Sequence, residues 1–98
     1  MIYELTILTP EKSNAEDLAN IKSTVEKWGA IHTTEDDGVK RLAYPITLQG
    51  ITHEVARYLF YTVELNEGDP QKLSGELSRK DEVLRFLLVK QDPKYSKR

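Results

Sequence analysis

Apolar and polar side chains alternate along three stretches of the chain, and a period of two is the pattern of a β-strand with one buried face. The clearest example is at the N-terminus, where Tyr3, Leu5 and Ile7 are separated by polar residues. A fourth stretch near the C-terminus is rich in apolar residues. The predicted strands are Ile2–Leu8, about Ala30 to Ile46, Tyr58–Leu65 and Val83–Lys90. Within the second strand Glu35–Gly38 predicts a bulge or a bend, and Thr47–Val55 predicts a loop after it.

Between these strands, apolar residues recur every three or four positions, which is the period of an α-helix packed by one face. The first helix is predicted to begin at Ser13 as its cap, because Glu16 stands three residues later at the capping-box spacing. It is predicted to stop at Gly29 in a left-handed conformation. The second helix is predicted to run from Asp69, which precedes a proline, to about Arg79. The apolar stripe of the first helix consists of Leu18, Ile21, Val25 and Trp28.

The order of these elements is βαββαβ, without an internal repeat. Right-handed crossovers then give a ferredoxin-like α+β fold, a split βαβ arrangement with a four-stranded antiparallel sheet. Each helix has one apolar stripe, so both helices should cover the same face of the sheet. We expect residues 1–90 to form this one domain and residues 91–98 to form a flexible basic tail.

The sheet face without helices is predicted to be unusually apolar. Strand alternation directs Leu42 and Tyr44 toward the helices and places Arg41 and Arg85 on the opposite face. An exposed apolar surface of this kind normally marks a partner-binding site. The apolar residues expected on that surface are Ile2, Leu8, Ala43, Tyr58, Phe60, Leu87 and Val89.

Net charge is −2, but it is unevenly distributed along the chain. Residues 1–39 contain three basic and eight acidic residues, a formal charge of −5, whereas residues 40–98 contain eleven basic and eight acidic residues, a formal charge of +3. Such a distribution is typical of a protein that contacts nucleic acid on one side. No apolar run is long enough to span a bilayer, so we expect a cytoplasmic protein without a membrane partner.

The sequence offers no converging catalytic or metal-binding set. There is no cysteine, and His32 and His53 have no spacing typical of metal ligands. Glu35–Asp37 lacks the spaced oxygen ligands of a calcium loop. We therefore expect neither enzymatic activity nor a metal, a cofactor or a small-molecule substrate.

The segment Gly38–Ile46 places Lys40 and Arg41 at the head of a predicted strand, where the two cations either bind phosphate or merely keep the strand end soluble. Three further short segments are Tyr3–Leu5, Trp28–Ala30 and Asp81–Arg85. In their order and spacing, these segments and Gly38–Ile46 resemble the family of the sixth protein of the bacterial small ribosomal subunit. The chain resembles this family from about residue 2 to residue 90. Thr47–Gly50 departs from the basic residues usual in the family, and the connection from Gly50 to Arg57 is a few residues longer than usual.

The resemblance implies a structural protein of the small ribosomal subunit that binds ribosomal RNA and pairs with the eighteenth small-subunit protein. Carried onto this chain, it makes Lys40, Arg41 and Arg85 the candidate RNA contacts. Charge and position, without a matched motif, extend the candidates to Arg79, Lys80 and Lys90. The alternative is a small-ligand regulatory module, or a self-dimerising module that hides its apolar face against a second copy.

Overall fold

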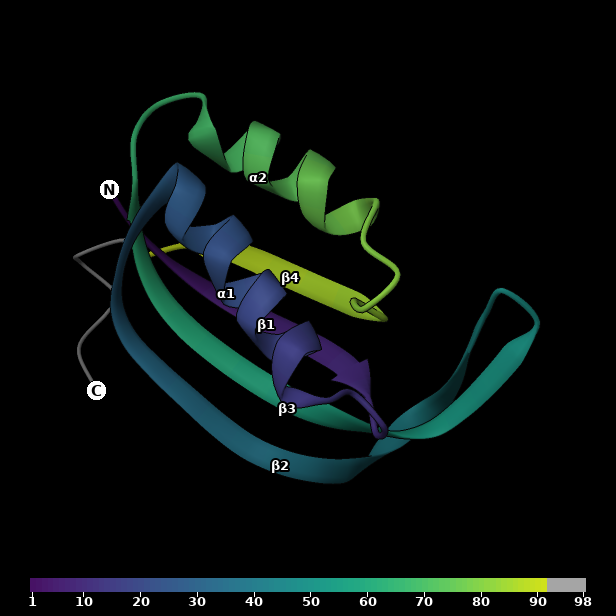
Figure 1. Cartoon of the computed structure of the whole chain (residues 1–98). Coiled ribbons are helices and arrows are strands. Elements are labelled where there is room, and N and C mark those ends of the chain that lie inside the picture. Colours follow the sequence, from purple (N-terminus) through teal and green to yellow (C-terminus); the bar gives the residue numbers. More distant parts are fainter. Residues whose placement is uncertain (92–98) are drawn as a thin grey trace.

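The computed structural model describes residues 1–91. Four strands form one antiparallel sheet in the order β2-β3-β1-β4, and Figure 1 shows both helices lying over the same face of it. The predicted ferredoxin-like fold is therefore confirmed. The predicted tail lies outside the described residues except for Gln91, whose backbone N–H donates to the Ile2 carbonyl over 2.8 Å. The elements are β1 (Ile2–Pro10), α1 (Ala15–Trp28), β2 (Gly29–Leu48), β3 (Ile51–Leu65), α2 (Asp69–Ser78) and β4 (Arg85–Lys90).

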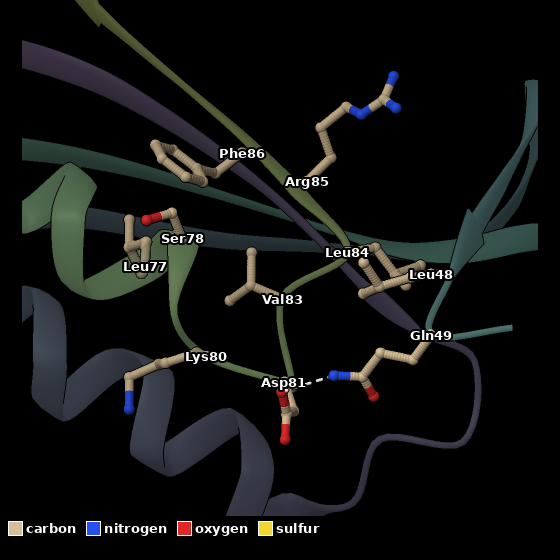
Figure 2. A pocket seen from close by; sticks show the side chains of 10 residues that line it. All are labelled: Leu48, Gln49, Leu77, Ser78, Lys80, Asp81, Val83, Leu84, Arg85 and Phe86. Carbon is tan, nitrogen blue, oxygen red and sulfur yellow. Dashed lines mark hydrogen bonds between the residues drawn. The ribbon is translucent and has the colours of Figure 1, made fainter. Parts of the chain in front are cut away.

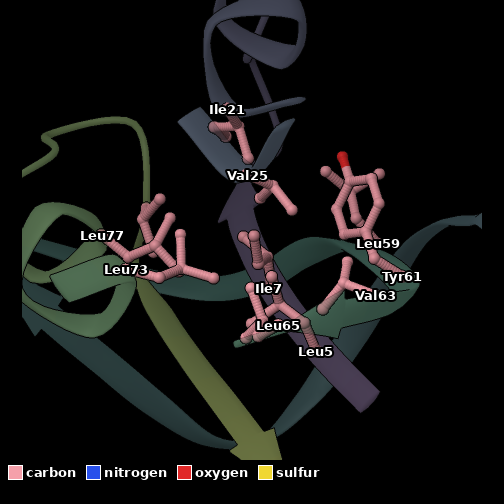
Figure 3. Packing of buried hydrophobic residues seen from close by; sticks show 11 residues of the cluster. Leu5, Ile7, Ile21, Val25, Leu59, Tyr61, Val63, Leu65, Leu73 and Leu77 are labelled. Atoms are coloured by element: carbon pink, nitrogen blue, oxygen red, sulfur yellow. The ribbon is translucent and has the colours of Figure 1, made fainter. Parts of the chain in front are cut away.

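The hydrophobic core lies between the sheet and the two helices, and Figure 3 shows the packing of its buried residues. In β1 and β3 alternate residues enter this core, as the pattern of the sequence predicted. Leu88 and Phe86 of β4 pack against its border. Trp28, expected to close the stripe of α1, is half-buried rather than enclosed. The fully buried members are Leu5, Ile7, Ile21, Val25, Val63, Leu65, Leu73 and Leu77.

The helix caps differ from the predicted ones by one residue. Asn14, not Ser13, caps α1: its side chain accepts from the Asp17 N–H over 2.8 Å, and the Asp17 carboxylate accepts from the Asn14 N–H over 3.3 Å. This is the same reciprocal arrangement as the predicted capping box, shifted along the chain. In α2 the cap is Gly68 at φ 90°, so Asp69 is already the first helical residue.

Gly29 does not stop α1 in a left-handed conformation, and this prediction is wrong. Its φ of −162° is extended, and the residue begins β2. Glycine is nevertheless required there for a different reason. A Cβ atom would collide with the carbonyl oxygen of Glu64 and with the side chain of Leu65 on the neighbouring strand.

The predicted loop Thr47–Val55 is instead the end of a long β-hairpin. Strands β2 and β3 continue past the end of β1 and are joined by two residues, Gln49 and Gly50, with φ of 54° and 79°. Two successive positive φ values are typical of a type I′ turn, whose twist suits a hairpin. We call residues 41–55 the arm. In Figure 1 the arm extends beyond the end of the four-stranded sheet.

Candidate functional site

The sheet face opposite the helices is uncovered within the described residues, and we call it the open face (Figure 1). The register places its residues in rows that run across the strands. One row contains Phe60, Thr6 and Leu87, and the next contains Tyr58, Leu8 and Arg85. The third row joins Thr62, Glu4 and Val89.

An apolar strip crosses the open face from β3 to β4. Leu87 is 62% exposed and Val89 is 47% exposed, although both are large aliphatic residues. The rings of Tyr58 and Phe60 lie with their centroids 6.4 Å apart and inclined at 33°, and both are half-buried. With Leu8 beside Tyr58, and with Thr6 between Phe60 and Leu87, these residues form a largely apolar surface that could pack against another macromolecule.

Six of the seven predicted partner-binding residues take the predicted position on this face, and only Ala43 does not. Ile2 lies at its end, next to Glu64 of β3. Their role in binding a partner stays a prediction. The six residues are Ile2, Leu8, Tyr58, Phe60, Leu87 and Val89.

A bulge in β2 changes which cation reaches the open face. The register shifts between the Asp36–Leu59 and Gly38–Tyr58 pairs, so that Lys40 pairs with Ala56 and lies on the open face. The Asp36 carboxylate supports this bulge, because it accepts from the Gly38 N–H over 2.8 Å. It also accepts from the Arg57 guanidinium over 2.9 Å.

The prediction that placed Arg41 and Ala43 on the open face is therefore wrong. Arg41 pairs with Val55, one position out of phase with Lys40 and beyond the last residue of β1. Ala43 lies in another irregular stretch of β2, between the pairs of Arg41 and Ile46. Both residues belong to the arm. Tyr44, expected in the core beside Leu42, is 82% exposed.

Lys40 makes two contacts on the open face. Its Nζ lies 5.6 Å from the centroid of the Tyr58 ring and donates to the Asp37 carboxylate over 3.0 Å. This hydrogen bond from Lys40 lowers the pKa of Asp37 below its ordinary value. Lys40 is thus an exposed cation placed against an aromatic ring, although one carboxylate already shares its charge.

Five of the six candidate RNA-binding cations lie at the end of the domain that carries the arm. Lys40 and Arg85 stand near the last residues of β1 on the open face, and Arg41 begins the arm. Arg79 and Lys80 follow α2 and lead toward Asp81, which hydrogen-bonds to the arm. Lys90 lies at the opposite end, where it pairs with Tyr3.

The tip of the arm returns to the connection between α2 and β4, and a hollow of about 320 Å³ lies there. Figure 2 shows Gln49 donating to the Asp81 carboxylate, over 3.0 Å, beside the apolar side chains of Leu48 and Leu84. Lys80 and Arg85 line the same hollow, but in Figure 2 their charged ends point away from one another. The two cations therefore do not converge on one phosphate inside this hollow.

A second, acidic depression of about 340 Å³ lies on the open face between β1, β3 and β2. Glu4 and Glu35 stand on its two sides: Glu35 of β2 pairs with Phe60 of β3, and Glu4 of β1 pairs with Thr62 of β3. Together with the cations at the arm, these carboxylates make the open face acidic toward Glu4 and basic toward Arg85. A partner bound across the face would meet both signs of charge.

The histidines occupy separate places. His32 Nε2 lies 3.0 Å from the Glu64 carboxylate at the sheet surface, and His53 lies in the arm. Within residues 1–91 no three histidine or acidic side chains are arranged to hold a metal ion. None of the helices in that part of the chain is long and apolar enough to cross a membrane.

The molecule is thus an α+β ferredoxin-like protein whose distinctive features are a partly apolar open face and a projecting arm. The family model for ribosomal protein S6 matches residues 2–90. The small ribosomal subunit protein bS6 of Thermus thermophilus is 33% identical over 97 residues, covering 93% of this chain and 92% of that protein. The bS6 protein of Ruthia magnifica is 31% identical over 99 residues, covering 92% of this chain and 80% of that protein.

Among solved structures, 30S ribosomal protein S6 of Thermotoga maritima has the same fold, with a TM-score of 0.74 at 20% identity, covering 92% of this chain and 86% of that one. This chain belongs to the ribosomal protein S6 family of the small ribosomal subunit. The family is a structural, non-enzymatic part of the translation machinery, and membership places the chain at the ribosome in the cytoplasm. The resemblance found from the sequence is confirmed.

Proposed function

We propose that this chain binds small-subunit ribosomal RNA and pairs with the eighteenth small-subunit ribosomal protein. The RNA contacts are the cations at the arm end of the domain, with Lys90 as a separate contact at the other end. The protein partner occupies the apolar strip of the open face. The residues proposed at the arm end are Lys40, Arg41, Arg79, Lys80 and Arg85.

The observation that carries the proposal is the exposure of Leu87 and Val89 on the same helix-free sheet face as Phe60. Large contiguous apolar patches are rare on monomers, because water disfavours them. Arg85 stands two residues from Leu87 on the same face, so a partner seated on the strip would lie beside a basic rim. A composite of protein and RNA can then cover both parts at once.

The cations at the arm end support RNA as the second ligand. Arg79, Lys80 and Arg85 have no ion-pair partner within residues 1–91. Phosphates are the ligands such side chains neutralise, and the released counterions make the affinity depend on salt. Overall negative charge does not prevent this, because eleven of the fourteen basic residues lie in residues 40–98, which carry a formal charge of +3.

The RNA part is tested by measuring the affinity of the chain for purified small-subunit ribosomal RNA over a series of salt concentrations, with the partner protein present. Arg85→Gln should reduce the slope of log affinity against log salt by about one unit, because one phosphate contact is lost. Lys22→Gln is the matched control, since Lys22 is an exposed cation on α1, in the helix layer. Equal slopes in wild type and Arg85→Gln would remove Arg85 from the RNA contacts.

The partner part is tested by titrating the chain with the purified eighteenth protein. Leu87→Glu should weaken this complex at least tenfold, because a carboxylate would be desolvated in the centre of the strip. Ala19→Glu on the exposed side of α1 is the control. Sedimentation of the isolated chain tests the alternative: a stable dimer that Leu87→Glu converts to monomer, without any complex with the eighteenth protein, would favour self-association.

A further inference from the structure

Tyr44 is the most exposed of the large apolar side chains within residues 1–91, at 82%. Alternation along the sequence directed it into the core, yet it lies on the arm, away from the helices and from the strip formed by Leu87 and Val89. A tyrosine ring exposed to this degree gains little stability from burial, and its whole face is free to contact a ligand.

The backbone around Tyr44 pushes its ring outward. From the Arg41–Val55 pair to the Ile46–His53 pair, β2 advances five residues while β3 advances two, so β2 carries three extra residues. Since β2 is an edge strand, nothing restrains the surplus on its outer side. Bulges of this kind redirect side chains and occur often at functional sites. Pro45 also restricts Tyr44 to extended conformations, which limits the ways its ring can turn back.

A cation, Arg41, lies three residues before Tyr44 on the same strand. The side chain of Arg41 is 77% exposed, and its nearest carboxylate oxygen, from Glu54, is 3.6 Å away and also largely exposed. Such a solvated pair contributes little, so the guanidinium can exchange Glu54 for another anion at small cost. Arg41 and Tyr44 thus present a cation and an aromatic face together on a projecting element.

We propose that Tyr44 stacks on one unpaired nucleobase of RNA while Arg41 contacts an adjoining phosphate. The inference rests on the proposed RNA binding and names its recognition element. Aromatic rings beside cations are the usual way in which proteins bind unpaired nucleotides. RNA fits better than a protein anchor, because an anchor residue is normally surrounded by other apolar contacts. Here the neighbours of Tyr44 in the strand are the small residues Ala43 and Pro45.

The first experiment identifies what Tyr44 touches. Tyr44 is replaced by the photoreactive p-benzoylphenylalanine, the chain is assembled into small ribosomal subunits, and the irradiated product is digested and analysed by mass spectrometry. We expect adducts with ribonucleotides. Adducts with peptides only, or incorporation without any adduct at Tyr44, would overturn the inference and leave the proposed function standing. Failure of the wild-type chain to enter the subunits would count against the proposed function and this inference with it.

The second experiment separates stacking from general apolar contact. Affinity for small-subunit ribosomal RNA should fall roughly tenfold or more in Tyr44→Leu, which lacks the ring, and should change less than about twofold in Tyr44→Phe, which keeps it. The salt slope should not change in either variant, because no charge is lost, whereas Arg41→Gln should reduce it by about one unit. Ile51→Ser is the control, since Ile51 is an exposed residue of the arm on β3.

Urea melts will establish that these variants fold, as expected for side chains so exposed. Equal RNA affinity of Tyr44→Leu and wild type would contradict stacking. A loss of affinity for the partner protein in Tyr44→Leu, with RNA binding unchanged, would assign the ring to a protein contact instead.

Discussion

The indole N–H of Trp28 donates a hydrogen bond to Glu76 Oε1 over 3.0 Å, and this contact joins α1 to α2. The ammonium of Lys27 donates to the same oxygen over 2.9 Å. The hydrogen bond from Lys27, followed by that from Trp28, lowers the pKa of Glu76 below its ordinary value, although partial burial opposes the shift. One carboxylate oxygen thus connects the two helices at a point where the tryptophan ring is only half-buried.

We expect Glu76→Gln to lower stability at neutral pH and to have no effect in strong acid. A carboxyl group whose pKa is lower in the folded state stabilises the fold above its unfolded pKa, and this contribution is lost as the pH falls through the folded value. Urea midpoints measured at pH 7 and near pH 3 should therefore differ less in Glu76→Gln than in wild type. Glu67→Gln, at an exposed turn, is the control. An equal difference in Glu76→Gln and wild type would refute the linkage.

Trp28→Phe isolates the hydrogen bond, because it keeps most of the ring packing and removes the donor. We expect a loss of about 1 kcal/mol in the free energy of unfolding. Trp28→Ala should cost about 2–3 kcal/mol, which is less than the ~3–5 kcal/mol of a fully enclosed aromatic residue, since the ring is half-buried. Urea melts of both variants measure this. A loss above about 4 kcal/mol in Trp28→Ala would mean that the ring is more enclosed than the structure shows.

Gly29→Ala and Gly75→Ala form a matched pair with opposite expected signs. The methyl group at Gly29 would meet the backbone of Glu64 and the side chain of Leu65, so we expect a loss of about 1–3 kcal/mol. At Gly75 in α2 no atom lies near the added carbon, and alanine should gain about 0.5–1 kcal/mol by its helix propensity. Thermal or urea unfolding of the two variants checks both signs. Stabilisation by Gly29→Ala would show that β2 can move away from β3 at this pair.

Ionisation of the Tyr61 hydroxyl should lower the stability of the fold at alkaline pH. Burial raises the pKa of its hydroxyl, and the charges of Asp36 and Glu26 raise it further. A group whose folded pKa is raised stabilises the fold below its unfolded pKa, about 10, and this contribution disappears as the pH rises through the folded value. Tyr61→Phe should therefore change stability at pH 7 by less than about 1 kcal/mol and weaken the decline above pH 10. A decline as steep as that of wild type would assign the alkaline limit to other groups.

Phe60→Ala tests the strip for a role in binding rather than in folding. Phe60 lies on the open face outside the core, so we expect the substitution to weaken partner binding by about 2 kcal/mol. The free energy of unfolding should fall by a smaller amount, because the ring is half-buried against Tyr58. Titration with the partner and urea unfolding give the two values. A variant that fails to fold would show that Phe60 supports the domain itself.

The sequence was a sufficient guide to the fold because β1, β3 and both helices keep their periods without interruption. Tyr3, Leu5 and Ile7 enter or border the core as their alternation requires, and the stripe of α1 does the same. Leu42 and Tyr44 could not be placed in this way, because they lie in the irregular stretch of β2 between the Arg41–Val55 and Ile46–His53 pairs, where extra residues interrupt the alternation. A strand pattern carries no mark of where such a residue is inserted, apart from Gly38 at the shift that follows Asp36.

The arm was missed for a related reason. A hairpin with a two-residue turn is recognised from glycine or asparagine at both turn positions, and here Gln49 takes a left-handed conformation that its type seldom adopts. Gly50 alone was a weak signal within a polar stretch. The candidate cations were chosen from the charge pattern and the family resemblance, and their role in RNA binding stays a prediction. Arg41 was expected on a strand, as it is, but the part of the arm from Thr47 to Val55 was taken for a loop.

The irregular register of β2 should also disfavour aggregation between copies of the chain. β2 is the longest strand and lies at the edge of the sheet, where unpaired N–H and C=O groups can recruit the edge of another molecule and start aggregation. Its register shifts leave no regular run longer than four residues, and Pro45 within the last shift lacks an N–H altogether. A strand from a neighbouring molecule would find the ladder broken within a few residues. The same surplus residues that expose Tyr44 thus help to keep crowded copies of this protein apart before they are assembled.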